Sequence, residues 1–454
     1  MTAAEQRATI ALASIMSMRM LGLFMIFPVF ALYARDLPNV TPLLVGLAIG
    51  IYGLTQGILQ IPFGMLSDRI GRKPIIYIGL LIFALGSIVA ALSTSITGII
   101  IGRALQGCGA IASTVLALTA DITREEHRTK AMAILGITIG MSFVLALIIG
   151  PIVNAWISVP GIFWLTALFA LAGIVVLYRA VPQTLTSSHR DTTPALTQFK
   201  RVLQDSQLLR LDIGIFILHL FLTSMFVVLP IALVEGNVEV DHHWQIYVSV
   251  LIAAIVVMMP LIIYAEKYRH MKQVFVGAIG LLVLSQIGLS YLYHSITGIV
   301  IMLFLFFTAF NLLEATLPSL ISKLAPTESK GTAMGVYSSS QFFGAFLGGI
   351  GGGWLYQHYS IGAVFAFCTL LAVIWFILAA TMQNPTHLSS HLVKVGQIDK
   401  EQANNLTQCL MKVPGVAEVV IILEEEVAYM KVDRKVLDMD ALDGCTEVCA
   451  NVLI

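Results

Sequence analysis

Long apolar runs fill the chain from its first residues to about position 386. A helix needs about 20 mostly apolar residues to cross the hydrocarbon core of a membrane, and twelve segments of that length follow one another. They are 8–33, 43–66, 74–94, 97–121, 130–156, 159–179, 210–234, 244–265, 273–293, 296–322, 331–357 and 361–382. The pattern predicts an all-α membrane protein with twelve transmembrane helices.

The twelve segments form two sets of six that resemble each other at an offset of roughly 200 residues. Residues 62–69, at the end of the second segment, match 260–267 at the end of the eighth, and 130–132 match 332–334. Helices that carry so few charges rarely match at their charged turns by chance. We therefore expect two matched six-helix halves with a polar site at their interface.

The pattern changes after Pro385, where short alternating runs replace the long apolar ones. Strands are predicted at 391–395, 416–423, 427–432 and 451–454, and helices at 399–412 and 437–449. The order β-α-β-β-α-β is typical of a ferredoxin-like domain. The predicted parts are a first six-helix bundle (1–180), a linker (181–209), a second six-helix bundle (210–386) and a cytoplasmic tail domain (387–454).

Composition excludes several classes of protein. Hydrophobic residues make up 58% of the chain and charged residues 11%, whereas a soluble globular protein carries about 25% charged residues. An ordinary cytosolic enzyme, a disordered chain and a nucleic-acid binder are therefore ruled out. No nucleotide-binding loop, zinc signature or nucleophile elbow is present, so we expect no enzyme, no cofactor and no nucleic-acid partner.

Lys and Arg lie almost entirely in alternate loops. Among the loops of the other side only 34–42 holds a basic residue, Arg35. Because basic loops stay in the cytoplasm, both termini are predicted to be cytoplasmic. The first segment lacks a cleavage site and is interpreted as a retained helix.

Residues 64–74, GMLSDRIGRKP, resemble position for position the signature loop of the major facilitator superfamily of transporters. The resemblance implies a twelve-helix transporter in which Asp68 faces the N-terminus of the helix near Gly331, whose dipole favours an anion. That contact would hold the outward-open state. The alternative is that these charges only fix topology. The predicted conformational latch comprises Gly64, Asp68, Arg69, Gly71, Arg72, Lys73 and, as a partner for the loop, Asp121.

Two further motifs concern energy coupling. Residues 103–110, RALQGCGA, resemble the motif of proton-coupled members of the family, although Arg103 could equally extend outward to the interface. Gly150-Pro151 resembles part of the antiporter motif, but Asn154-Ala155 departs from it. The whole chain resembles bacterial inner-membrane members that carry a small C-terminal domain, which implies a proton-driven exporter.

Charged groups inside the apolar segments mark the candidate site, because a charge in hydrocarbon costs roughly 2.5–3.5 kcal/mol. Arg19 lies about 16 Å and Glu314 about 12 Å along their helices from the cytoplasmic end. In the family fold the first, fourth, seventh and tenth helices line the cavity. Five candidate residues all lie on those four helices: Arg19, Arg103, His219, Asn311 and Glu314.

Glu314 is the predicted proton carrier, because a carboxylic acid in a shielded cavity can hold and release a proton. The alternative is a static ion pair with Arg19. His219 could relay protons or simply form a hydrogen bond within the bundle. Three amides on neighbouring helices could contact substrate or join helices: Gln56, Gln60 and Gln341.

The tail resembles a heavy-metal-associated domain, yet its loop at 396–398 has no cysteine, so we expect no metal there. Five cysteines indicate no disulfide framework, and Cys445 and Cys449, one helical turn apart, are interpreted as ordinary helix residues rather than soft-metal ligands. Regulation or self-association remains the expectation for this domain.

The leading interpretation is a secondary transporter of the bacterial inner membrane, multi-pass, with both termini cytoplasmic. It would be a proton-coupled antiporter that exports a small drug-like or metabolite substrate by alternating access. Its partners would be the substrate, protons and membrane lipid, with the proton gradient as its energy source. The alternative is a non-transporting membrane sensor that signals through the tail.

Overall fold

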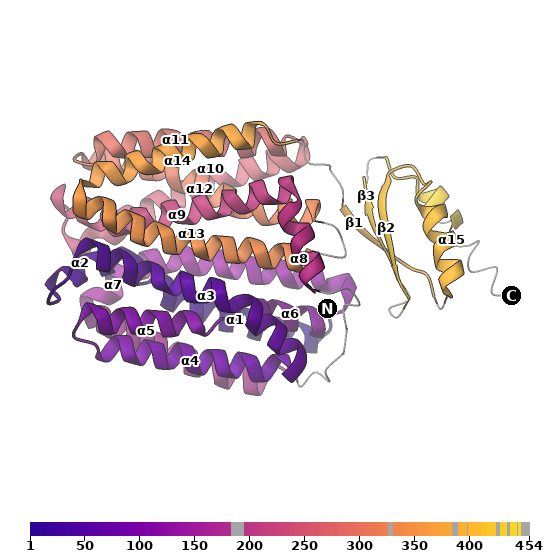
Figure 1. The fold of residues 1–454 in the computed structure, drawn as a ribbon, viewed down its shortest axis with the longest axis horizontal. Helices are drawn as coiled ribbons and strands as arrows, with labels where there is room; N and C mark the ends of the chain where they lie inside the picture. Colours follow the sequence, from indigo (N-terminus) through magenta and orange to yellow (C-terminus); the bar gives the residue numbers. More distant parts are fainter. Residues whose placement is uncertain are drawn as a thin grey trace.

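The apolar runs fold into long helices that lie side by side, and the tail forms a separate unit at one end of them (Figure 1). The computed structural model describes residues 1–182, 195–325, 330–383, 389–396, 398–423, 427–433, 436–442 and 444–445. The helices before the linker are α1 (Ala3–Phe24), α2 (Phe27–Tyr33), α3 (Pro42–Ile70), α4 (Arg72–Leu92), α5 (Ile96–Cys108), α6 (Ala112–Ile122) and α7 (Glu125–Ala180). Those that follow are α8 (Ala195–Gln204), α9 (Ser206–Glu235), α10 (His243–Lys267), α11 (Met271–Leu292), α12 (Ile296–Leu324), α13 (Lys330–His358) and α14 (Ile361–Ala380).

Several predicted segments are interrupted or joined. The first segment breaks at Met25–Ile26 between α1 and α2, and the fourth breaks at 109–111 between α5 and α6. The fifth and sixth segments form one continuous element, α7, with non-helical backbone at Ser158. A straight helix of that length would span about 84 Å, nearly three times the hydrocarbon core.

Contacts with α1 show that α7 doubles back at Ser158. In the chain order of α7 the contacts are Ser17–Ser142, Met25–Gly150, Gly22–Thr166 and Ile15–Gly173. The position on α1 first advances and then retreats, so the two halves of α7 run in opposite directions. The reversal accounts for two of the predicted segments within one continuous element.

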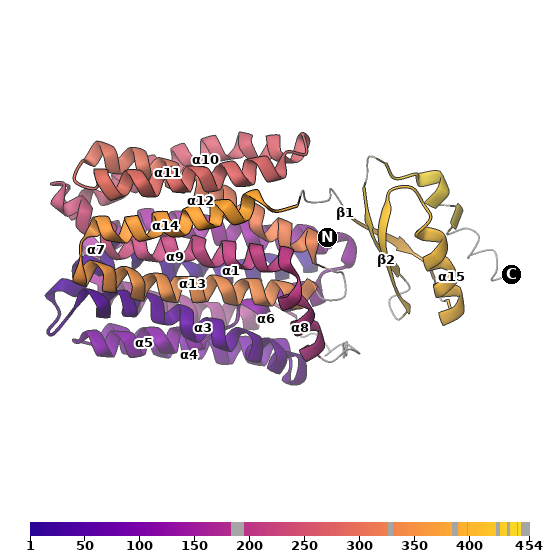
Figure 2. The ribbon, with the colours of Figure 1, turned by 45° about the horizontal axis from the view of Figure 1, so that its top comes forward.

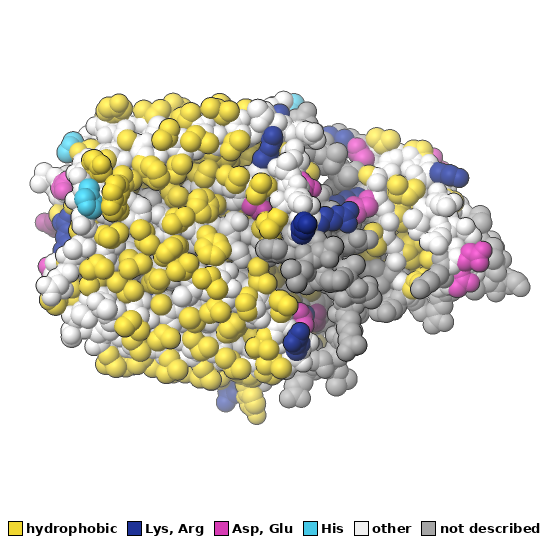
Figure 3. All heavy atoms as spheres, viewed as in Figure 1, with side chains coloured by type: hydrophobic (Ala, Val, Ile, Leu, Met, Phe, Trp, Pro, Cys, Tyr) yellow, Lys and Arg dark blue, Asp and Glu magenta, His cyan; other side chains and the backbone are white. Residues whose placement is uncertain are grey.

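Ten helical segments among the described residues are long and apolar enough to cross a membrane. The segment Lys130–Ala180 is one of them, and α13 is not among the ten. Hydrophobic side chains cover the flank of the bundle in the face shown, and Lys and Arg gather toward the end beside the tail (Figure 3). A protein with this surface is adapted to lipid around its middle. The count of twelve crossings remains a prediction.

Helices of the first half lie together below those of the second half in Figure 1, and α13 packs against α3 of the first half and α9 of the second. Glycines permit this close packing. A Cβ on Gly50 would lie 2.7 Å from the Phe346 oxygen, and one on Gly348 would lie 2.8 Å from the Leu220 Cα. The glycines of α13 therefore serve close helix contact.

The tail is a three-stranded antiparallel sheet covered by one described helix. The elements are β1 (Ser389–Lys394), α15 (Lys400–Leu410), β2 (Val416–Ile422) and β3 (Val427–Val432). The strand order is β1-β3-β2, with Leu392 opposite Tyr429 and Val420 opposite the same residue on the other side. Residues 439–442 and 444–445 are helical. The stub strand 451–454 lies outside the described residues, so the ferredoxin-like topology remains a prediction.

The tail contains a disulfide bond, which corrects our interpretation of Cys445 as an ordinary helix residue. Cys409 of α15 is bonded to Cys445, with their Cα atoms 5.9 Å apart. The two residues are separated by 36 positions, so local spacing gave no sign that they meet across the core of the domain. Cys449 lies outside the described residues.

The sheet docks on the second half of the helical bundle, at the end that also carries the N-terminus (Figure 2). Arg269, between α10 and α11, forms a two-point ion pair with Asp433 at 2.6 and 3.0 Å. Lys431 of β3 donates to the Ala325 carbonyl at 2.6 Å. A cation that bonds the final carbonyls of a helix is favourable, so Lys431 caps the end of α12. We call this end of the bundle the tail side and the opposite end the far side.

Candidate functional site

Glu314 lies in a small polar cluster within the second half of the bundle. Its side chain is 36% exposed, and its Oε1 accepts a hydrogen bond from Gln341 Nε2 at 3.4 Å. The same amide nitrogen donates to His219 Nε2 at 2.8 Å, and His219 Nδ1 donates to the Ile215 carbonyl at 3.3 Å. This pattern fits a neutral imidazole that carries its proton on Nδ1. The cluster joins three helices: α9, α12 and α13.

Unsatisfied polar atoms surround this cluster. Among the described residues, Glu314 Oε2 is buried without a hydrogen-bond partner and lies 3.9 Å from His219 Nε2. In the same part of the chain, Asn311 Nδ2, one turn earlier on α12, and the Tyr337 hydroxyl on α13 are also buried without hydrogen-bond partners. Buried polar groups are normally hydrogen-bonded. Several unsatisfied hydrogen-bonding groups close together are expected at a site that binds protons, water or a substrate.

Arg19 belongs to a second cluster, within the first half of the bundle. The side chain is 1% exposed, and its Nη2 donates to Tyr52 Oη at 2.9 Å and to Gln56 Oε1 at 2.6 Å. Gln56 in turn donates to Gln60 Oε1 at 2.8 Å, and the guanidinium also lies over the Phe83 ring. Across the described residues no ion pair joins Arg19 to Glu314. The static pair considered from the sequence is therefore not formed in this conformation.

Arg103 is held inside the first half and does not reach the interface. Its guanidinium donates to the Ala48 and Ile49 carbonyls at 3.3 Å each and to Gln106 Oε1 at 2.9 Å. Gln106 Nε2 in turn donates a hydrogen bond to Ser87 Oγ at 2.8 Å. A guanidinium has five N–H donors in a fixed fork, so this one residue fixes α5 against α3.

The two halves meet through aromatic rings on the far side of these clusters. The ring centroid of Phe143 in α7 lies 5.0 Å from that of Phe24 and 5.7 Å from that of Phe310 in α12. The ring centroids of Phe27 and Phe226 of α9 are 5.7 Å apart. Beyond them the Arg35 guanidinium donates to Tyr356 Oη at 3.2 Å. The two halves are therefore in contact on the far side, where a small cavity of about 110 Å³ is lined by residues of both, among them Arg35, Val227 and Tyr356.

The tail side is open by comparison. A Cβ added to Gly331 or Gly335 at the start of α13, or to Gly136 or Gly140 of α7, would meet no atom within 4 Å. Among the described residues, the two halves therefore make closer contact on the far side than at these four glycines.

The signature loop brings most of its predicted residues together. Arg72 pairs with Asp68 and donates from Nε to Asp121 at 3.0 Å, and its Nη1 bonds Ser67. Gly71 has φ 100°, a conformation that favours glycine, where α3 ends and α4 begins. Lys73 donates to the Val181 carbonyl at 2.8 Å.

Other members of the predicted latch make different contacts. Gly64 lies against Ser113 of α6, and Arg69 is exposed. The Asp68 side chain is 58% exposed, and Gly331 has open space beside it. The predicted contact between Asp68 and the N-terminus of α13 is therefore not made in this conformation. The contact was expected to hold the outward-open state.

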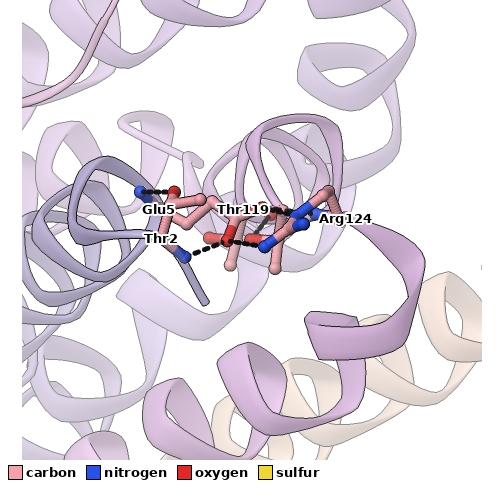
Figure 4. Close-up of polar contacts among 5 residues, drawn as sticks. Thr2, Glu5, Thr119 and Arg124 are labelled. Atoms are coloured by element: carbon pink, nitrogen blue, oxygen red, sulfur yellow. Dashed lines mark hydrogen bonds and ion pairs between the residues drawn. The ribbon is translucent and has the colours of Figure 1, made fainter.

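An ion pair that the sequence gave no reason to expect ties α1 to the start of α7. Glu5, 8% exposed, accepts from Arg124 Nε at 2.8 Å and from the Thr2 nitrogen at 2.6 Å, as Figure 4 shows. Thr2 and Glu5 form a capping box, whose Thr-x-x-Glu spacing could have signalled the start of the helix. The long-range partner Arg124 could not be identified from spacing.

A family model describes most of the chain. The model of the Major Facilitator Superfamily matches residues 12–349 and again 244–403, and that of the YajR YAM domain matches 398–442. The chain therefore belongs to the Major Facilitator Superfamily of membrane transporters. The resemblance to members with a C-terminal domain is confirmed.

Relatives with curated names agree with this assignment. The chain is 46% identical over 438 residues to "Inner membrane transport protein YajR" of Escherichia coli (strain K12), which covers 96% of each chain. It is 26% identical over 355 residues to "Multidrug resistance protein MdtH" of Proteus mirabilis (strain HI4320), covering 74% of this chain and 84% of the relative. These relatives are transporters and not enzymes, as the sequence predicts.

Solved structures share the fold. The human organic anion transporter MFSD10 matches with a TM-score of 0.62 and 19% identity, over 83% of this chain and 99% of that one. A bacterial homologue of the lysosomal transporter Spinster, in an inward-facing and unoccupied conformation, matches with a TM-score of 0.65 and 14% identity, over 84% and 98%. At such identities the likeness concerns the fold alone.

Proposed function

We propose that this transporter is a proton-coupled antiporter of the bacterial inner membrane that exports a small drug-like or metabolite substrate. The observation that carries the proposal is the environment of Glu314. Its side chain is 36% exposed and lies against a neutral imidazole and an amide, and no cation is fixed against it among the described residues. A carboxyl group so placed can gain and lose a proton.

Topology follows from charge. The tail side carries the basic loops and would face the cytoplasm by the positive-inside rule. Counting the reversal of α7 and including α13, the chain crosses the membrane twelve times. The conformation in which the two halves meet on the far side would then expose Glu314 to the cytoplasm, where the proton is released and substrate enters.

Coupling would arise because proton and substrate compete for one site. When the site opens to the far side, a proton binds Glu314 and displaces substrate; when it opens to the cytoplasm, proton release readies the site for the next substrate. His219 and Gln341 orient the carboxylate, and Asn311 offers a free amide donor one turn away. Gln56 and Gln60 of α3 belong to the Arg19 cluster of the first half.

The class of substrate is inferred from two features. The polar groups of the site are few and are surrounded by aromatic side chains such as Phe310 and Phe143, which suits an apolar molecule with one or two polar groups. One relative is named a multidrug resistance protein. Both features support a drug-like substrate.

The latch would act in the other conformation. When the halves close on the cytoplasmic side, the start of α13 approaches α3, and the exposed Asp68 can meet the helix N-terminus near Gly331. Arg72 and Asp121 already hold the loop in place for that contact.

Flux in inverted vesicles with an imposed pH gradient tests the proposal, with ethidium as the probe. We expect Glu314→Gln to lose gradient-driven flux while the protein still inserts and folds. The matched control is Glu235→Gln, which changes an exposed carboxylate at the end of α9 and should leave flux intact. Undiminished gradient-driven flux in Glu314→Gln would refute the role of this carboxyl group.

A further inference from the structure

A second carboxylate lies in the bundle without any partner. Asp212 of α9 is 3% exposed, and both of its carboxylate oxygens are buried with no hydrogen-bond partner among the described residues. Asp205, one residue before α9, shows the contrast, because its side chain accepts from the Gln207 and Leu208 nitrogens as a helix cap. Buried carboxylates without partners are rare and call for an explanation.

Asp212 is aligned with the Glu314 cluster. It precedes His219 by seven residues, so the two side chains share one face of α9, with Asp212 about 10 Å closer to the tail side. The Tyr337 hydroxyl, one turn before Gln341 on α13, is likewise buried with no hydrogen-bond partner among the described residues.

The charges around Asp212 do not neutralise it. Arg210 stands two residues earlier, and side chains at that spacing do not face each other on a helix. From α14, Trp375 packs beside the neighbouring Gly214, and neither carboxylate oxygen of Asp212 has a hydrogen-bond partner among the described residues. An ionised carboxylate buried without a partner is costly, so the protonated form of Asp212 suits this conformation.

We propose that Asp212 is the second proton-binding group of the transporter, through which the proton held by Glu314 leaves toward the tail side. A water molecule takes the proton from the Glu314 carboxylic acid and passes a proton to the Asp212 carboxylate, so one O–H bond breaks and one forms at each step and no electrons are transferred. This inference rests on the proposed function of Glu314 as a proton carrier.

Infrared difference spectra of the purified full-length protein in lipid nanodiscs, recorded during a pH titration, test proton binding without a substrate. We expect separate protonated-carboxyl signals for the two groups, one lost in Asp212→Asn and the other in Glu314→Gln. Asp205→Asn is the control, since an amide still caps α9. If the Asp212→Asn spectrum equals that of the wild type, Asp212 does not exchange protons and the proposal is overturned.

The route of the proton is tested by rate. After a rapid upward pH jump, the Glu314 signal should decay at least ~10-fold more slowly in Asp212→Asn than in the wild type or Asp205→Asn. Unchanged decay in Asp212→Asn overturns this route. Thermal unfolding of each variant separates a folding defect from a proton-transfer defect. These readouts need no flux, so they are independent of the vesicle assay. If the wild type shows no proton exchange at Asp212 but its proton-coupled flux is intact, only this inference is refuted.

Discussion

Gly46 of α3 offers a way to shift the balance between the two conformations of the transporter. A Cβ at this position would overlap the Gly349 carbonyl and lie 3.1 Å from the Gly353 Cα. All of these neighbours are backbone atoms of α13, which cannot move aside as a flexible side chain could. Gly46→Ala should therefore disfavour the conformation in which α3 and α13 touch on the far side.

The size of the effect follows from the cost of overpacking, about 1–3 kcal/mol. The gain of about 0.5–1 kcal/mol from replacing glycine by alanine within a helix applies to both conformations and cancels. The population ratio should therefore move ~5- to ~150-fold toward the conformation that is open on the far side.

Spin labels report the shift directly. Labels in place of Arg35 and Tyr356, whose side chains are 3.2 Å apart on the far side, should separate in Gly46→Ala when measured by double electron–electron resonance. The matched control is Gly351→Ala on α13, because its Cβ would meet nothing within 4 Å. It should leave the distance distribution unchanged.

Two results would refute this reasoning. One is an identical distance distribution for Gly46→Ala and Gly351→Ala. The other is a lower melting temperature for Gly46→Ala with no change in distance, which would mean that the contact stabilises the fold as a whole rather than one conformation.

Three further changes test structural contacts. Arg103→Lys keeps the charge but loses the fork that bonds α3, so the unfolding free energy should fall by about 1–3 kcal/mol in denaturant melts. Cys409→Ser opens a link across 36 residues and should destabilise the tail by about 4 kcal/mol, measured by amide exchange; unaltered exchange would contradict it. Arg269→Asp and Asp433→Arg should each release the tail, and the double variant should restore docking, measured by spin-label distances.

The segments of the bundle could be predicted because membranes impose a simple length and polarity rule on each helix. Where the chain bends inside a segment could not. The break at Met25–Ile26 occurs in a run that is apolar throughout, whereas the reversal at Ser158 falls between the predicted segments 130–156 and 159–179. The tail strands were found from alternation, but the pairing of Cys409 with Cys445 depends on tertiary contact.

The candidate site was found in part because buried charge is rare enough to stand out. Glu314, His219 and Gln341 are brought together, whereas Arg19 turned to Tyr52 and Gln56 within its own half. The number of residues to the helix end predicts how deep a side chain lies in the membrane. It does not predict the direction in which the side chain points around the helix axis. Asp212 was missed because it lies near a predicted helix end, where a carboxylate usually reaches water.

The two halves treat buried charge differently, and this links the proton site to the tail. In the first half the buried charges within the bundle are the Arg19 and Arg103 guanidinium groups, which do not titrate, and Glu5, which is paired with Arg124 at the tail-side end; the second half holds the carboxyl groups of Glu314 and Asp212. The tail docks on the second half, where Lys431 caps α12, the helix that carries Glu314. If protonation of Glu314 shifts α12, docking must change with it, and linkage makes the coupling reciprocal. Spin-label distances between α11 and α15 should therefore respond to pH in the wild type and not in Glu314→Gln. An equal pH response in both proteins would show that the tail is insensitive to the proton site.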